Sequence, residues 1–89
     1  MQTETSQIIV KRFFEIIYDL KSRKVIRGIQ TFTTRYGINK RNFYTCAKEP
    51  ERDIFQVAWL GYLVNDYNVS ATWLLTGQGE KYQKLVNNS

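Results

Sequence analysis

Apolar side chains recur at helical spacing near the beginning of the chain. Between residues 6 and 23 they fall near i, i+4, i+7, i+8 and i+11, the spacing of one face of an α-helix. This face is formed by Ile9, Phe13, Ile16, Ile17 and Leu20. Ser6 precedes it as a candidate N-cap, because a serine hydroxyl accepts a hydrogen bond from a free N–H of the first turn. The pattern predicts a helix from residue 6 to about residue 23, preceded by a disordered tail over residues 1–5.

The next segment carries two opposing signals. Residues 30–36 are rich in threonine and aromatic residues, which favour β-strands. However, Gly37 follows, and a glycine at positive φ allows one helix to end and another to begin within three residues. Asn39 is a good N-cap for a second short helix from Lys40 to about Lys48. We therefore predict two short helices joined by a turn over about residues 29–48, rather than a strand.

The second half of the chain begins at its single proline. Pro50 disfavours a helical conformation at Glu49 and can itself open a helix, which we predict from about residue 52 to about residue 67. This helix would be apolar nearly all round. Phe55, Trp59 and Tyr62 fall at i, i+4 and i+7 and would form a second apolar stripe on it. Such a helix is either central in the fold or shared with a partner chain.

Capping residues bracket the last predicted helix. Ser70 is a candidate N-cap for a short helix over residues 71–75, and Gly77 is a candidate C-terminal stop. The pattern along the whole chain therefore predicts an all-α fold, and 89 residues leave room for one hydrophobic core.

Basic residues are concentrated in the middle of the chain. There are 13 Lys and Arg against 8 Asp and Glu, which gives a net charge of +5. Nine of these basic residues lie between residues 21 and 52, where only Glu49 and Glu51 oppose them, so this window carries +7 (nine less two). The distribution favours a polyanion-binding surface, although a merely solvated basic surface has the same composition.

The residue types argue against catalysis. The chain has no histidine and one cysteine, Cys46, so imidazole acid–base chemistry and a cysteine cluster for zinc are excluded. The acidic residues are scattered, and there is no glycine-rich phosphate loop. We expect no enzyme activity, no metal, no cofactor and no small-molecule ligand. No apolar run reaches the roughly 20 residues of a membrane span, and a lone cysteine suits a reducing compartment, so a cytoplasmic protein is expected.

Two short helices joined by a tight turn are one way in which proteins place a helix in the DNA major groove. The first helix must brace the second, which requires a small residue at the crossing, a glycine at the bend and apolar inner faces. Thr33 stands at the crossing, Gly37 at the bend and Ile38 at the corner. The inner faces would be formed by Phe32, Tyr36, Phe43 and Cys46.

With these features, residues 29–48 resemble the helix-turn-helix of the phage repressor and Cro-like (lambda-repressor-like) family. Residues 69–79 read V-S-A-T-W-L-L-T-G-Q-G and are similar to a V-S-x-x-W-L-L-T-G-x-G string that is common in that family. With the first helix, the resemblance spans about residues 6–79. The chain departs from the family at Thr33, where alanine is usual, at the bulky Tyr36, and at Gln30, which is displaced by one position from a frequent glutamine.

The resemblance implies a compact five-helix, lambda-repressor-like DNA-binding domain over residues 6–79, followed by a polar tail over residues 80–89. It implies sequence-specific binding of double-stranded DNA by a transcriptional regulator, a repressor of the phage or mobile-element type, associated with the nucleoid. The alternative is a protein–protein interaction module on a helix-turn-helix scaffold without specific DNA binding, since a fold does not fix a function.

The resemblance also implies which residues contact DNA. Base contacts would come from the start and outer face of the second short helix, from Asn39, Lys40, Arg41, Tyr44 and Thr45. Phosphate contacts would come from Arg27, Gln30, Thr31, Arg35, Asn42 and Lys48. Because one helix reads only a few base pairs, a homodimer on a palindromic site is expected. The candidate dimer interface residues are Phe55, Trp59, Tyr62 and Trp73.

Overall fold

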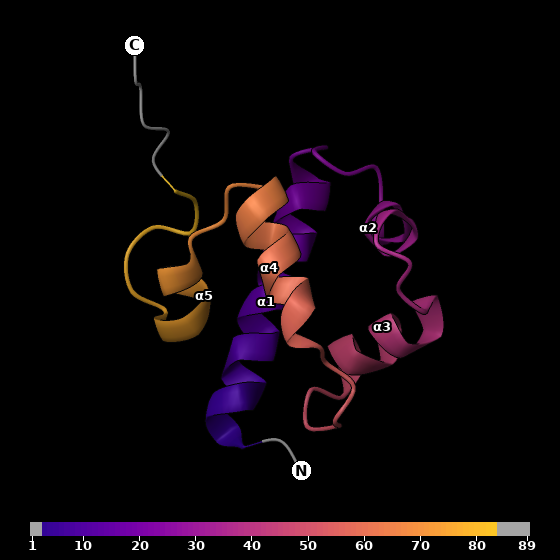
Figure 1. Cartoon of the computed structure of the whole chain (residues 1–89), viewed down its shortest axis with the longest axis horizontal. Helices are drawn as coiled ribbons and strands as arrows, with labels where there is room; N and C mark the ends of the chain where they lie inside the picture. Colours follow the sequence, from indigo (N-terminus) through magenta and orange to yellow (C-terminus); the bar gives the residue numbers. More distant parts are fainter. Residues whose placement is uncertain (1–2, 84–89) are drawn as a thin grey trace. The chain divides into compact units, whose positions relative to one another are not determined.

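The computed structural model describes residues 3–83 and is all-α (Figure 1). Its helices in chain order are α1 (Glu4–Ser22), α2 (Ile29–Arg35), α3 (Lys40–Lys48), α4 (Val57–Asp66) and α5 (Ala71–Thr76). No strand forms within residues 3–83; one isolated antiparallel bridge joins Val69 and Tyr82. The predicted all-α fold with five helices is therefore confirmed. The chain divides into two compact units, Met1–Phe55 and Gln56–Ser89. The single domain over residues 6–79 stays a prediction.

Helix α1 begins earlier than the sequence predicts. Thr3, and not Ser6, is the N-cap, because its hydroxyl oxygen accepts a hydrogen bond from the backbone N–H of Ser6 at 3.1 Å. Glu4 stands in the first turn, where a carboxylate interacts favourably with the helix dipole. Residues 4 and 5 are therefore helical rather than part of a tail; residues 1 and 2 lie outside the described residues. The helix ends at Ser22, close to the predicted end.

Helices α2 and α3 have the predicted positions. Thr33 tolerates the helix because its hydroxyl donates to the Gln30 carbonyl oxygen at 3.1 Å, while Phe32 beside it is fully buried. Burial of an aromatic ring on the inner face thus outweighs the strand propensity of the threonines. Gly37 makes the turn with φ 65°, as predicted. In Figure 1, α2 is seen nearly end-on while α3 lies across the view, so the two helices cross at a steep angle.

Phenylalanine rings form the core of the first unit. The ring centroid of Phe13 on α1 lies 5.9 Å from that of Phe32 on α2 and 5.9 Å from that of Phe43 on α3. Phe14 adds a fourth ring, 5.0 Å from Phe43. All four are buried, and their edge-to-face or tilted contacts add to the free energy of burial. This cluster ties α1, α2 and α3 together and so fixes the orientation of α3. On α1, Val10 and Phe14 join the buried face, whereas Ile9 is only half-buried.

The prediction of a helix from residue 52 is wrong. Residues 50–54 form turns and a bend, with the Arg52 N–H bonded to the Glu49 carbonyl at 3.1 Å, and α4 begins only at Val57. The Phe55 ring packs 5.1 Å from Phe13 in the first unit, which holds this segment in a non-helical path. Phe55 therefore does not share a helix with Trp59 and Tyr62, and the predicted stripe does not form.

The second unit consists of α4, α5 and the segment that follows. Ser70 caps α5 by accepting from the Trp73 N–H at 3.2 Å, and Gly77 ends it with φ 77°, both as predicted. The chain then returns beside α5: the Ser70 N–H donates to the Lys81 carbonyl at 2.8 Å, and the Gln83 side chain donates to the Val69 carbonyl at 2.9 Å. Residues 80–83 are thus part of the unit, and residues 84–89 lie outside the described residues. Within residues 3–83, no helix is long and apolar enough to cross a membrane.

Candidate nucleic-acid interface

Helix α3 separates a buried apolar side from an exposed polar side. Its start is fixed by Asn39, whose side-chain oxygen accepts from the Asn42 N–H at 2.9 Å. From this start, Phe43 and Cys46 fall on the inner face, and both are fully buried. The residues on the other side are exposed except for Thr45, which is half-buried. This outer face is formed by Lys40, Arg41, Asn42, Tyr44, Thr45 and Lys48.

The capping bond limits what Asn39 can do. Its side-chain oxygen accepts the capping bond, which leaves one lone pair of that oxygen and the side-chain N–H groups for contact with a base. A bidentate contact to adenine therefore requires this oxygen to accept a second hydrogen bond in the orientation that the cap sets. Arg41, another predicted base contact, takes no part in this cap.

One hydrogen bond joins the two helices at their N-terminal ends. The Lys40 ammonium donates to the side-chain oxygen of Gln30 over 3.4 Å, and both side chains are exposed. Gln30 is a predicted phosphate contact and Lys40 a predicted base contact, so the structure brings one residue from each set together. The contact is long and exposed, which makes it weak on its own.

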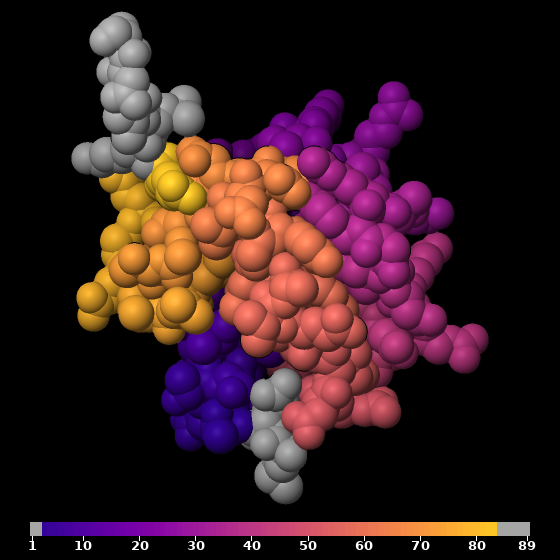
Figure 2. Space-filling model, viewed as in Figure 1, coloured from indigo at the N-terminus to yellow at the C-terminus, as the bar shows by residue number. Residues whose placement is uncertain are grey.

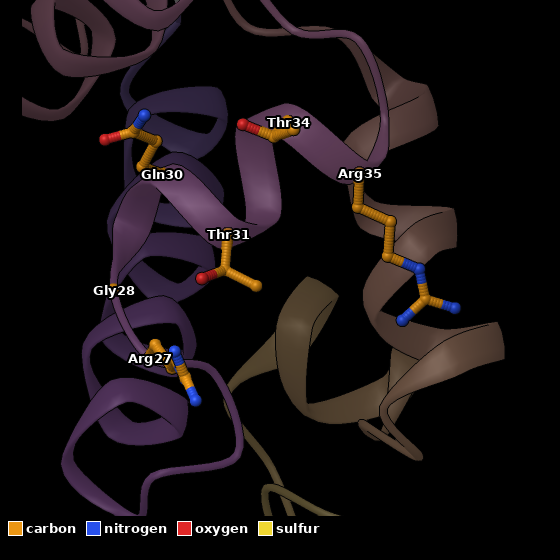
Figure 3. Close-up of a pocket in the computed structure, with 6 residues that line it drawn as sticks. All are labelled: Arg27, Gly28, Gln30, Thr31, Thr34 and Arg35. Carbon is orange, nitrogen blue, oxygen red and sulfur yellow. The ribbon is translucent and has the colours of Figure 1, made fainter.

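An open groove of about 600 Å³ lies along α2 and the loop before it. It is lined by Arg27, Gly28, Gln30, Thr31, Thr34 and Arg35. Figure 3 shows Thr31 between the side chains of Arg27 and Arg35. Four of the six predicted phosphate contacts, Arg27, Gln30, Thr31 and Arg35, are therefore brought together at one place. The other two, Asn42 and Lys48, lie on the exposed side of α3.

Thr34 was missed by the sequence reasoning. It stands three residues after Thr31 and is therefore on the same side of α2, with an exposed hydroxyl that lines the groove. The i, i+3 spacing of Thr31 and Thr34 in the sequence could have placed Thr34 on the same side of the helix as Thr31. The guanidinium of Arg35 lies 5.2 Å from the centre of the Tyr36 ring, a cation–π distance that restricts its motion.

The segment that contains α2 and α3 carries only positive charge. No acidic residue occurs between Lys21 and Lys48, while eight basic residues do. In Figure 2, side chains of the magenta to rose part of the chain, which contains α2 and α3, project from the surface. The ion pairs at its margins, Arg23–Asp19 at 3.1 Å and Arg52–Glu49 at 3.9 Å, involve acidic residues outside this interval.

The Cys46 thiol is buried and unreactive. It is fully buried, and burial raises the pKa of its thiol to about 11, so the thiol stays protonated at neutral pH. A reactive cysteine needs thiolate character and solvent access, and Cys46 has neither. Within the part of the chain that the structure describes, no group of Cys, Asp and Glu side chains could hold a metal ion.

The candidate dimer residues are not an exposed set. Trp59 and Trp73 are buried, at 3% and 9% exposure, and Phe55 and Tyr62 are half-buried. The Lys81 ammonium also covers the Trp73 ring at 5.5 Å. The open apolar surface of the second unit is instead a groove of about 400 Å³ between α4 and α5. It is lined by Val57, Ala58, Leu60, Gly61, Val64, Asn65, Ala71, Leu74 and Leu75.

Comparison with known proteins adds no relative. A scan against protein-family models, a search of curated proteins and a search of solved structures each found no match to this chain.

Proposed function

We propose that this protein is a sequence-specific double-stranded DNA-binding transcriptional regulator that inserts α3 into the major groove. The observation that carries the proposal is the outer face of α3, which is polar, basic and exposed on a helix whose other side is anchored by Phe43 and Cys46. The B-DNA major groove is about 12 Å wide and accepts one helix of this kind. A repressor of the phage or mobile-element type is the regulator that the sequence resemblance favours.

The roles of individual residues follow from their placement. Arg41 on the exposed face would donate to guanine O6 and N7, and Lys40 and Tyr44 would contact neighbouring bases. The groove along α2 would hold the DNA backbone, because Arg27 and Arg35 supply charge and Thr31 supplies a hydroxyl donor. Phosphate contacts set affinity and register, and base contacts set sequence preference.

A selection from random duplex DNA tests the proposal. Recovery of one enriched sequence, bound with an affinity that falls steeply as salt rises, is the expected result. Arg41→Ala should then relax the sequence preference at one or two positions, while Lys11→Ala on the exposed side of α1 should keep it. No enrichment, together with duplex affinity that does not change with salt, would contradict the proposal.

We further propose that the protein acts as a homodimer through the α4–α5 groove. Nine residues of α3 span about 13 Å, or about four base pairs, so one copy reads only a half-site. The residues that line the groove are apolar apart from Asn65, and two of them, Val57 and Leu75, are 79% and 50% exposed. An uncharged surface suits the pairing of two copies that each carry +5, because it brings no like charges into contact.

The same groove supports the second candidate function, a protein-interaction module that binds a different protein. The two functions differ in what the basic surface does. Salt-dependent duplex binding with a two-copy mass favours the regulator. A monomer that does not bind duplex DNA favours the interaction module.

A further inference from the structure

We infer that Lys24 is a further phosphate-binding residue, held by the C-terminal end of α1 in a backbone conformation that ordinarily requires glycine. The inference rests on the proposed DNA-binding function. It adds an element outside the helix-turn-helix segment to the DNA contact surface.

The loop after α1 has a well-defined geometry. The Lys24 N–H donates to the Lys21 carbonyl at 3.0 Å, and the Val25 N–H donates to the Leu20 carbonyl at 2.9 Å. These two bonds are the pair that defines a Schellman motif, in which the residue after the C-cap adopts the left-handed conformation. Here Arg23 is the C-cap, and Lys24 has φ 62°.

Lysine is an unfavourable choice at this position. Glycine dominates there because it has no Cβ to clash with the following carbonyl oxygen. The chain uses glycine for the left-handed residue at the end of α5, where Gly77 has φ 77°. Lys24 therefore accepts backbone strain that a glycine would relieve. A residue kept in a strained conformation is a reason to look for a function of its side chain.

The placement of Lys24 points to the DNA backbone as that function. Ile26 is buried and anchors the loop, whereas Lys24 and Arg27 on either side of it are exposed. Arg27 also lines the groove along α2, so the loop leads directly into the proposed phosphate-binding surface (Figure 3). Within residues 3–83, no acidic side chain forms an ion pair with Lys24. A loop that is already ordered presents its cation with little further loss of conformational entropy.

The alternative explanation is local. A lysine near the end of a helix also interacts favourably with the helix dipole, and that interaction alone would stabilise α1 without involving DNA. The two explanations predict different effects on binding. A dipole role changes only thermal stability, whereas a phosphate contact changes the salt dependence of DNA affinity.

The experiment measures the affinity of the full chain for a fluorescent duplex of random sequence by anisotropy, between about 50 and about 200 mM salt. Lys24→Gly and Lys24→Asn both suit the left-handed backbone and remove the charge. Lys24→Arg retains the charge. Lys11→Gln removes one charge from the exposed side of α1 and is the matched control. Thermal unfolding of each variant verifies that it is folded.

The plot of log affinity against log salt concentration has a negative slope. We expect this slope to become shallower by about 0.9 in Lys24→Gly and Lys24→Asn, because one phosphate contact is lost. Lys24→Arg and Lys11→Gln should keep the wild-type slope. Lys24→Gly should unfold at the wild-type temperature or above. If both charge-removing variants keep the wild-type slope, Lys24 does not bind phosphate, and the proposed function is unaffected. If the wild-type protein shows no salt-dependent duplex binding, the proposed function fails and this inference with it.

Discussion

The Lys40 ammonium at the start of α3 donates a hydrogen bond to the side-chain oxygen of Gln30 at the start of α2, over 3.4 Å. Gln30 also lines the groove in which we place the DNA backbone. The bond therefore links a proposed phosphate contact with a proposed base contact. A phosphate bound beside Gln30 would orient Lys40, and a base bound to Lys40 would orient Gln30. Such pairs are coupled in binding even when their bond contributes little to folding.

The first prediction concerns this coupling. Gln30→Ala and Lys40→Ala should each weaken binding to the selected DNA site, and the double variant should lose less than the sum of the two. We expect a coupling free energy of about 0.5–1 kcal/mol in a double-mutant cycle measured by anisotropy. The stability of all three variants should stay within about 0.5 kcal/mol of wild type, because both side chains are exposed. Strict additivity would show that the hydrogen bond has no role in DNA recognition.

The second prediction separates base contacts from phosphate contacts. Arg41→Ala should cost about 1–3 kcal/mol on the selected site and relax the preference at one or two positions, because a bidentate guanine contact is lost. Arg35→Ala should weaken all duplexes alike, because a phosphate contact carries no sequence information. Competition assays with matched and mismatched duplexes measure both effects. Unchanged affinity of both variants for every duplex would contradict the assignment.

The third prediction concerns the turn between α2 and α3. Gly37 has φ 65°, and a Cβ there would meet nothing within 4 Å, so the cost of Gly37→Ala is backbone strain alone. We expect a loss of about 1 kcal/mol in the free energy of unfolding. Gly61→Ala is the control, because Gly61 lies within α4 and also has open space around its Cα, but its φ is not positive. The control should lose no stability in urea denaturation, since alanine is favoured over glycine inside a helix. Equal effects of the two substitutions would contradict the role given to positive φ.

Sequence reasoning succeeded where a local signal and the tertiary structure agree. Asn39 followed by a basic, amphipathic nine-residue segment predicts α3 with the bounds that the structure has. It failed where contacts between distant residues decide. Phe55 reads as helical by spacing, but its ring packs on Phe13, 42 positions earlier in the chain, and the helix begins after it. Likewise, serine is the better N-cap by residue type, which favours Ser6, but the backbone geometry makes Thr3 the cap.

Grooves could not be predicted for a related reason. Hydrophobic spacing shows that α4 is apolar on several sides, but not which side is covered by the rest of the chain. The structure buries Trp59 and leaves Val57 exposed, although both side chains are apolar. That Gln30, Thr31 and Arg35 lie close together could be predicted, because all three are on one short helix, whose geometry requires no long-range contact.

The fourth prediction concerns Cys46 and pH. Burial raises the pKa of its thiol from 9.0 to about 11, so the unfolded chain releases this proton at lower pH than the folded chain does. The contribution of Cys46 to stability is therefore complete below about pH 9 and is lost as pH rises to about 11. A shift of this size corresponds to at most about 3 kcal/mol. Urea denaturation of wild type and Cys46→Ala at pH 8 and pH 10.5 isolates the effect, because other groups titrate alike in both proteins. A difference between the two proteins that does not change with pH would contradict the buried, protonated thiol.

The last prediction concerns the α4–α5 groove. Leu75 is half exposed beside it, so Leu75→Asp should leave the core intact while placing a charge on the proposed dimer surface. We expect the wild type to have a two-copy mass in light scattering at tens of micromolar, and Leu75→Asp to have a one-copy mass with an unchanged circular dichroism spectrum. Exposed Leu75 contributes little to folding, which makes it a safer probe than the buried Trp73. Gln78→Asp adds the same charge at an exposed residue that follows α5 and does not line the groove, so it is the matched control and should stay dimeric. Leu75→Asp should also bind the full palindromic site more weakly than the wild type does, because the recognition helix of a second copy no longer adds its contacts to those of the first. A one-copy mass for the wild type would contradict the proposed dimer; combined with an absence of duplex binding, it would favour the interaction-module function.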